Sequence, residues 1–303
     1  MQLPRRIFIQ RKRLATLVFV CFVTICAVFN ITQDHAKSSV STLSRLDSVV
    51  NPTDHEEDSW SFVELFNHLE SSEMIDRYAC KVSAEFGGYV INDNSTAYKD
   101  GHKVVCLDEG VRPALNDCLV YSFGIEDEWS FDDDMAKLGC EVYAFDPSMQ
   151  AKDHNRSARV HFYQEGLWFR KQNLVVNDYP GVYWEVDTLS SFYDRFKTIH
   201  GDRPIDYVKI DIESDEWYIL PQIMSSGILN RVKQLAMEIH FMYVDIEEAR
   251  RRVKILKSLE RDHGMIPFAY TANLVTKGMA PDAPDNFACA EIVYLNPKFR
   301  LKS

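Results

Sequence analysis

The stretch 118–147 constrains the fold of this chain more than any other. It predicts an apolar strand at 118–123 that ends in Gly124, a short helix, and a second apolar strand at 140–145 that ends in Asp146. This order is typical of the first βαβ unit of a nucleotide-type α/β domain. The acid follows the glycine by 22 residues, where a carboxylate can accept both hydroxyls of a ribose.

Strand and helix patterns keep alternating after this unit. Strands are expected at 118–123, 140–145, 158–163, 205–211 and 234–240, and helices near 130–138, 187–198, 214–225 and 246–262. Two final apolar runs, at 266–271 and 287–295, predict an antiparallel pair. We therefore expect an α/β fold with a doubly wound, mostly parallel, Rossmann-like sheet, helices on both faces and a terminal antiparallel hairpin.

The N-terminus differs from the rest of the chain. A basic tail at 1–13 precedes an uncharged apolar run at 14–31, which as a helix would span about 27 Å. The basic side predicts a cytosolic tail and a lumenal remainder, as in a single-pass type II membrane protein of the secretory pathway. A cleaved signal peptide, which would release a secreted protein, is the alternative. Glycosylation sequons at Asn94–Thr96 and Asn155–Ser157 agree with a lumenal location.

Three further segments follow the apolar run. Residues 32–59 are polar without apolar periodicity and predict a flexible stem. Residues 60–100 predict a helical accessory segment, whose apolar spacing is given by Phe62, Phe66, Leu69, Met74, Ile75, Tyr78 and Val82. The main domain is expected over 101–303.

Charge and cysteines limit the function classes. The formal charge is −11, and because the tail supplies five positive charges and the first 31 residues hold no acid, the remainder carries −16. A body this acidic argues against a nucleic-acid substrate.

Five cysteines follow the apolar run: Cys80, Cys106, Cys118, Cys140 and Cys289. Their number is odd, so at least one is free or paired between chains. No spacing resembles a zinc site, and we assign no metal ligands. The oligomeric state is not indicated.

The turn after the first strand selects the kind of ligand. It keeps one glycine, whereas a pyrophosphate needs several, and its acids would repel phosphate. An acidic turn suits S-adenosylmethionine, which has no phosphate and carries an ammonium and a sulfonium. The predicted cofactor-binding residues are Ser122, Gly124, Glu126, Asp127, Asp146 at the ribose and Glu165 against the adenine. For Glu165 an ordinary turn is an equal alternative.

Ionisable residues also follow the fourth and fifth predicted strands. Asp211 and Glu213 can orient the sulfonium, act as a general base or bind a metal. Asp215 and Glu216 are interpreted as favouring the next helix N-terminus. His240, on the same strand face as Glu238, can deprotonate a hydroxyl near neutral pH, with a structural histidine as the alternative. The predicted catalytic residues are Asp211, His240 and Glu213.

Several motifs together resemble the methyltransferase-like protein 24 group. They are Val120–Ile125 with Trp129–Asp132, Val142–Pro147 and Val208–Glu213. The Lys-Ile-Asp-Ile-Glu element and the Glu-Ile-His strand also resemble FkbM-type methyltransferases. The resemblance covers roughly residues 75–300 and implies a class I S-adenosylmethionine-dependent fold.

Four residues match the motifs of that family by position. Gly124 and Asp146 fall on the cofactor motif, and Asp211 and Glu213 on the acidic motif after the fourth strand. The chain departs from the FkbM-type pattern at Ser214, where those sequences usually carry glycine. The resemblance implies a reaction class and names no acceptor.

The functional prediction is therefore S-adenosylmethionine-dependent methyl transfer to oxygen. The expected acceptor is lumenal or secreted: a glycan, a small molecule or a protein. One alternative is a Golgi-type glycosyltransferase, in which Asp132–Asp134 would hold a metal and a sugar diphosphate. The other is a methyltransferase-fold protein that binds without catalysis, since most of the turn glycines are absent.

Overall fold

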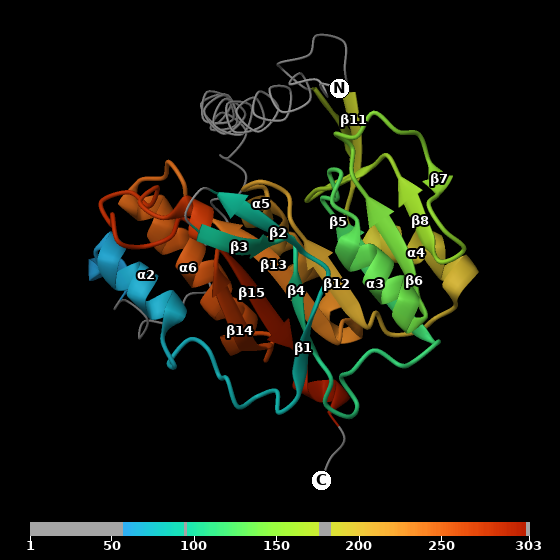
Figure 1. Ribbon diagram of the computed structural model, residues 1–303, viewed down its shortest axis with the longest axis horizontal. Helices are drawn as coiled ribbons and strands as arrows, with labels where there is room; N and C mark the ends of the chain where they lie inside the picture. Colours follow the sequence, from blue (N-terminus) through green and yellow to red (C-terminus); the bar gives the residue numbers. More distant parts are fainter. Residues whose placement is uncertain (1–56, 94–95, 176–182, 301–303) are drawn as a thin grey trace, which may run out of the picture. The chain divides into compact units, whose positions relative to one another are not determined.

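The computed structural model describes residues 57–93, 96–175 and 183–300, and a single sheet organises them (Figure 1). Its eight strands are β5 (Cys118–Phe123), β6 (Cys140–Phe145), β7 (His154–Asn155), β8 (Val160–Tyr163), β12 (Tyr207–Ile210), β13 (Gln234–His240), β14 (Ile266–Ala272) and β15 (Cys289–Leu295). They lie in the order β14-β15-β13-β12-β5-β6-β8-β7. The five strands from β13 to β8 are parallel. β15 lies between β13 and β14 and is antiparallel to both. The predicted Rossmann-like sheet with a terminal antiparallel pair is confirmed.

The strand order places a switch point between β5 and β12. From β5 the chain moves outward to β6 and β8, then returns to β12 on the other side of β5 and continues to β13. Ligands of such sheets bind at the carboxyl ends of the strands beside the switch point. Gly124 follows β5 and Asp211 follows β12 at this edge.

The main helices are α2 (Phe62–Glu70), α3 (Ser130–Leu138), α4 (Leu189–His200), α5 (Glu216–Ser226) and α6 (Ile246–Arg261). α4, α5 and α6 pack side by side on one face of the sheet, whereas α3 packs against β6 and β8 on the other (Figure 1). The four helices predicted after residue 101 are confirmed, with boundaries shifted by two residues at most. Apolar residues between sheet and helices, such as Phe131 and Phe192, are fully buried and form the core.

We expected the accessory segment to be helical, but it is helical only in part. Only α2 forms a helix, and four short strands follow it: β1 (Ser83–Phe86), β2 (Tyr89–Asp93), β3 (Thr96–Asp100) and β4 (Lys103–Cys106). Tyr78 and Val82, predicted on an apolar helix face, are 93% and 57% exposed. α2 ends because Ser71, its C-cap, adopts an extended backbone. Further on, the Asp76 side chain accepts a hydrogen bond from the Tyr78 amide in a local turn (3.0 Å), which is not helical.

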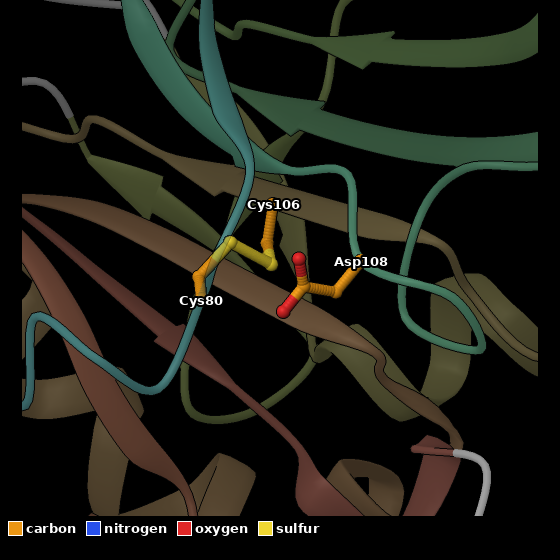
Figure 2. A group of neighbouring side chains, drawn as sticks. All are labelled: Cys80, Cys106 and Asp108. Atoms are coloured by element: carbon orange, nitrogen blue, oxygen red, sulfur yellow. A yellow bond between two sulfur atoms is a disulfide. The ribbon is translucent and has the colours of Figure 1, made fainter.

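Two disulfides connect segments of the described chain. Cys80–Cys106 attaches the segment before β1 to the end of β4, with 5.9 Å between the Cα atoms (Figure 2). Beside it, Asp108 accepts hydrogen bonds from the amides of Lys81 and Val82, each at 2.9 Å. The second disulfide, Cys118–Cys140, links the first residues of β5 and β6.

Cys289 keeps its thiol and is buried. The odd cysteine expected from the sequence is therefore identified.

A small three-stranded sheet was not predicted. It consists of β9 (Gly166–Leu167), β10 (Gln172–Val175) and β11 (Tyr183–Asp187) in the order β10-β11-β9, and it extends the connection between β8 and α4.

The predicted basic tail (1–13), membrane-spanning helix (14–31) and most of the stem (32–56) lie outside the described residues, as do Asn94 and Ser95 of the first sequon. Within the ranges described, no helix is long and apolar enough to cross a membrane. Asn155 of the second sequon is exposed on β7.

Candidate active site

The three residues predicted to be catalytic come together at the carboxyl ends of β12 and β13. Asp211, Glu213 and His240 each offer a ligand-type atom within 4.8 Å of the others. The Nε2 atom of His240 lies 3.6 Å from Glu213 Oε2. The His240 side chain is only 2% exposed, whereas that of Glu213 is 42% exposed. The cluster therefore has a buried imidazole on one side and an accessible carboxylate on the other.

Glu216 orients the His240 imidazole from the first turn of α5. Its Oε1 atom lies 3.0 Å from His240 Nδ1 and accepts a hydrogen bond from the His240 amide at 2.9 Å. Glu216 is fully buried. Burial opposes the charged imidazole, but Cys289 and Glu216, followed by Glu213, raise the His240 pKa well above its ordinary value. Glu216 does lie in the first turn of α5, as interpreted from the sequence. Its carboxylate in addition contacts a candidate catalytic group, which the sequence did not indicate.

Lys103 provides the buried positive charge beside this cluster. It comes from β4, is fully buried, lies 3.4 Å from Asp211 Oδ2 and pairs with Glu291 of β15. Burial works against the charged form of Asp211. Lys103, followed by Lys209 and His240, nevertheless lowers the Asp211 pKa to about 2. Asp211 is therefore a stable carboxylate at the edge of the sheet.

Glu238 lies next to Asp211 but differs from it in protonation. Its Oε1 atom accepts a hydrogen bond from the Asn273 side chain at 2.9 Å. Burial and the nearby Asp211 charge raise its pKa well above the ordinary value. Glu238 therefore holds its proton more tightly than an ordinary carboxyl group, because two neighbouring carboxyl groups cannot both be ionised cheaply.

The turn that presents Glu213 has an unusual backbone. Glu213 and Ser214 adopt φ angles of 54° and 79°, a left-handed conformation that L-residues with a side chain adopt at a cost. The glycine that FkbM-type sequences carry at position 214 avoids that cost. Burial raises the Glu213 pKa to about 7. The charge of His240 opposes this increase, and the charge of Asp211 adds to it.

Gly124 allows the two central loops to meet. A Cβ atom at this position would lie 1.5 Å from the Asp211 carbonyl oxygen. Its own φ is 75°, and its carbonyl accepts a hydrogen bond from the buried Lys209 ammonium. The predicted special role of this glycine has a physical basis here, but the close neighbour in the structure is the backbone of Asp211.

Asp146 lies at the end of β6, as predicted, yet its carboxylate is already engaged. Oδ2 accepts hydrogen bonds from the amides of Ile125 (2.9 Å) and Glu126 (2.7 Å). Oδ1 accepts hydrogen bonds from the amide (2.8 Å) and hydroxyl (2.6 Å) of Ser148. These four bonds occupy the acceptor capacity of a carboxylate. In this conformation Asp146 fixes the turn after β5 and has no free oxygen for a ribose.

The other predicted cofactor residues occupy different environments. Ser122 is fully buried and faces Asp132 in the first turn of α3, so its position argues against contact with a cofactor. Glu126 and Asp127 are exposed at the turn. Desolvation of the Glu126 carboxyl, followed by the charges of Asp146 and Asp211, raises the Glu126 pKa. Of this group, Glu126 faces the acidic edge.

Glu165 lies away from the Asp211 cluster. It forms a 2.8 Å ion pair with Arg195 of α4. Both residues line a recess of about 290 Å³, together with residues of β10 and β11. The recess holds a second ion pair, between Lys171 and Asp187 at 3.6 Å. Glu165 is therefore part of a charged surface recess beside the small sheet.

The Asp132–Asp134 run does not form one site. Asp132 is buried beneath the sheet, Asp133 pairs with Arg156 at 2.8 Å, and Asp134 pairs with Lys137 at 2.8 Å. Because each carboxylate has its own surroundings, the triplet lacks the shared geometry that a metal-bound sugar diphosphate requires.

Sequence reasoning missed three buried charges of the site: Lys103, Glu216 and Glu291. Lys103 and Glu291 were detectable, because each is a lone ionisable residue in an apolar strand, and such residues are usually paired. Glu216 gave no such signal, since an acid at a helix N-terminus is ordinary.

Comparisons with known proteins identify the family of this chain. The sequence model of a family described as a methyltransferase domain matches residues 29–278. The chain belongs to this methyltransferase family. The probable methyltransferase-like protein 24 of Rattus norvegicus is 32% identical over 190 residues, which cover 57% of this chain and 49% of that protein.

The Homo sapiens protein of the same name is 31% identical over 154 residues, covering 47% of this chain and 39% of its own length. The resemblance to the methyltransferase-like protein 24 group is confirmed. This methyltransferase chain spans about half the length of the curated relatives it matches, or less. A solved structure, a putative SAM-dependent methyltransferase from Streptococcus mutans, is 10% identical, with a TM-score of 0.34 over 69% of this chain and 56% of its own.

Proposed function

We propose that this protein is an S-adenosylmethionine-dependent methyltransferase that methylates a hydroxyl group. The family membership supports the reaction class. The observation that carries the proposal is the cluster of Asp211, Glu213 and His240 at the switch-point edge, one loop away from Gly124. It combines a stable carboxylate, an accessible carboxylate and an oriented imidazole at the edge where doubly wound sheets bind their ligands.

Charge supports S-adenosylmethionine as the cofactor. Asp100, Glu126 and Asp211 lie close enough for Asp211 to raise the pKa of the other two, after the larger effect of burial. A ligand with an ammonium and a sulfonium relieves this repulsion, whereas a phosphate would add to it. Glu126 and Asp211 would hold the cationic end. The ribose contact predicted for Asp146 requires that residue to give up hydrogen bonds within its own turn. When bound, the cofactor supplies an electrophilic methyl group.

The acceptor side of the site favours oxygen. A hydroxyl must lose its proton during methyl transfer, so a group that promotes this loss has to stand at the edge. The raised pKa of His240 favours its charged form, so Asp211 is the group in place to accept the proton. Glu216 fixes the direction of the His240 ring beside it. The open side of the cluster, where Glu213 is accessible, is the side from which an acceptor would approach.

The cysteines support a lumenal or secreted acceptor. Two disulfides among the described residues are typical of a protein that folds in an oxidising compartment. Within that compartment a glycan, a small molecule or a secreted protein can present the hydroxyl. The membrane anchor expected at 14–31 agrees with the same location and belongs to the proposal.

The cofactor assignment is tested by calorimetric titration of the full-length chain with S-adenosylhomocysteine in the presence of EDTA. Saturable binding is expected, and Glu126→Gln should weaken it. Glu247→Gln, an exposed acid of α6, is the matched control and should bind normally. Binding of a UDP-sugar in place of S-adenosylhomocysteine would contradict the proposal and favour a glycosyltransferase.

The reaction is tested with methyl-labelled cofactor and a panel of hydroxyl-bearing glycans, small molecules and secreted proteins. Transfer to oxygen is expected, with a loss of about 10²- to 10⁴-fold in Asp211→Asn. Cofactor binding without transfer to any acceptor would favour a protein that binds without catalysis.

A further inference from the structure

We propose that Asp211, Glu213 and His240 form a binding site for a divalent cation of the Mn²⁺ type. From the sequence, metal binding was one of three open roles for Asp211 and Glu213, and no ligand was assigned; the geometry adds His240 to them. Its occupation does not depend on methyl transfer, whereas the role we give the cation rests on the proposed function.

The three ligand atoms have suitable spacing. They lie within 4.8 Å of one another, and the closest measured pair, His240 Nε2 and Glu213 Oε2, is 3.6 Å apart. Ligands at about 2.1 Å from a metal are about 3 Å apart in neighbouring positions and about 4.2 Å apart across it. A slight contraction therefore places all three around one ion. Two carboxylates with one imidazole suit Mn²⁺ and similar cations.

Glu216 supplies a second, independent observation. Its Oε1 atom lies 3.0 Å from His240 Nδ1, and Glu216 is fully buried. A carboxylate on one ring nitrogen is the usual support of a histidine whose other nitrogen binds a metal. The other ring nitrogen, Nε2, lies 3.6 Å from Glu213 Oε2, which is longer than a hydrogen bond. This buried ring therefore directs Nε2 toward Glu213, and Asp211 lies within the same group.

The balance of charge also favours a cation. Five carboxyl groups surround the edge: Asp211, Glu213, Glu216, Glu238 and Glu291. Lys103 contacts Asp211 and Glu291 but makes no ion pair with Glu213 or Glu216. Within the described part of the chain, the ion pairs of these two acids are both with His240. Buried carboxylates in excess of their partners are costly, and a divalent cation offsets this.

Three other groups in the described chain bring suitable ligand atoms together, and each is less suitable. In the group of Glu238, His240 and Cys289, burial raises the pKa of the Cys289 thiol, so it is a poor thiolate ligand. Between Asp211, Glu238 and Glu291 the Lys103 ammonium already occupies the centre. Beside Asp108, the sulfurs of Cys80 and Cys106 are bonded to each other and cannot act as thiolates (Figure 2).

The cation would give the active site its means of activating a hydroxyl. An oxygen bound to a divalent cation loses its proton at lower pH than a free one. Because Glu213 is accessible, solvent or an acceptor oxygen can complete the coordination from the open side. Asp211 and His240 would then act as ligands and not as proton acceptors, and the hydroxyl proton would pass to solvent water on the open side.

Binding is tested with Mn²⁺ alone, by the loss of the free Mn²⁺ electron paramagnetic resonance signal on titration with the full-length chain. One ion per chain is expected without any cofactor. Glu213→Gln and His240→Gln should each weaken binding at least 10-fold. Glu216→Gln, which removes only the support of the ring, should weaken it by about 10- to 100-fold. Glu247→Gln, also an acid in the first turn of a helix, should leave it unchanged.

Thermal melts identify variants that fail to fold, and Glu213→Gln, at a partly exposed position, is the variant on which the test depends. No binding at millimolar Mn²⁺, or equal binding by Glu213→Gln and wild type, would overturn the proposal and leave His240 as the counter-ion of the acids. S-adenosylhomocysteine binding measured in EDTA is a separate readout. Its failure alongside intact Mn²⁺ binding would overturn the cofactor assignment and keep the cation site.

Discussion

Among the glycines that the structure describes, Gly124 leaves the least room for a Cβ atom. An alanine Cβ would meet the Asp211 carbonyl oxygen at 1.5 Å, and that contact is with backbone. The loops after β5 and β12 would have to separate, which would weaken the hydrogen bond from the Asp211 amide to the Phe123 carbonyl (3.1 Å). We expect Gly124→Ala to lower the free energy of unfolding by about 3 kcal/mol or more, measured by urea denaturation.

Gly264 is the matched control for this change. Its φ is also positive, at 66°, but a Cβ there meets nothing within 4 Å. Gly264→Ala should therefore cost only the conformational penalty of about 1–2 kcal/mol. Equal losses in the two variants would mean that the approach of Asp211 to Gly124 contributes nothing beyond backbone conformation.

Asp132 makes stability depend on pH. Both its carboxylate oxygens are buried, and the Ser122 hydroxyl faces them from β5 without forming a hydrogen bond of ordinary geometry. Burial raises the Asp132 pKa to about 6, although Lys209 of β12 and then Ser122 partly oppose this and Glu128 of the preceding turn adds to it. The unfolded carboxyl titrates near 3.8. The native state therefore holds the proton more tightly, and stability falls as pH rises from about 4 to 6.

Asp132→Asn should remove this dependence. The difference in unfolding free energy, variant minus wild type, should grow by on the order of 3 kcal/mol between pH 4 and 7. Urea denaturation at a series of pH values measures it. Asp127→Asn, at an exposed position, should show no such growth. A flat difference for Asp132→Asn would indicate that this carboxyl keeps an ordinary pKa when folded.

At the scale of elements, the connection from β12 to α5 is strained so that Glu213 faces the site. Ser214 adopts φ 79°. Ser214→Gly should raise the free energy of unfolding by about 0.5–1 kcal/mol, because the relief of strain exceeds the added flexibility of the unfolded chain. Ser225→Gly, inside α5, should lower it by about 0.5 kcal/mol. Chemical denaturation of both variants checks the opposite signs.

The elements that could be predicted from the sequence are those with one strong signal. Apolar strands flanked by glycine or acids, such as β5 and β6, match the structure residue for residue because a strand buried on both faces is mostly apolar. The segment around Tyr78 was misread as helix, since a few apolar residues at helical spacing arise by chance, and the chain has already left the helix at Ser71.

Some residues of the candidate site could be predicted from the sequence, and others could not. Asp211 and His240 were predictable because each directly follows or ends a buried strand at the switch-point edge. Lys103 reaches them across more than 100 residues of sequence, and only the folded chain brings β4 beside β12. The hydrogen bonds of Asp146 within its own turn depend on the exact path of that loop, which no residue pattern encodes.

At the scale of the whole molecule, disulfides hold together the face of the sheet that carries α3. Cys80–Cys106 fixes the segment that delivers Lys103 to the site, and Cys118–Cys140 fixes the first βαβ unit. A disulfide typically contributes about 2–4 kcal/mol, a large share of the 5–15 kcal/mol that stabilises a folded protein. The reduced chain should therefore melt at least about 8 °C lower.

Differential scanning fluorimetry with and without reductant measures this shift. Cys80→Ala/Cys106→Ala should reproduce about half of it without reductant, whereas Cys289→Ala, which removes the buried free thiol, should leave the response to reductant unchanged. Alkylation of the denatured, unreduced chain provides the independent count. Because four of the seven cysteines are paired, at most three should react. Reaction of five or more, with no change in melting on reduction, would contradict disulfide stabilisation and remove its support for an oxidising compartment.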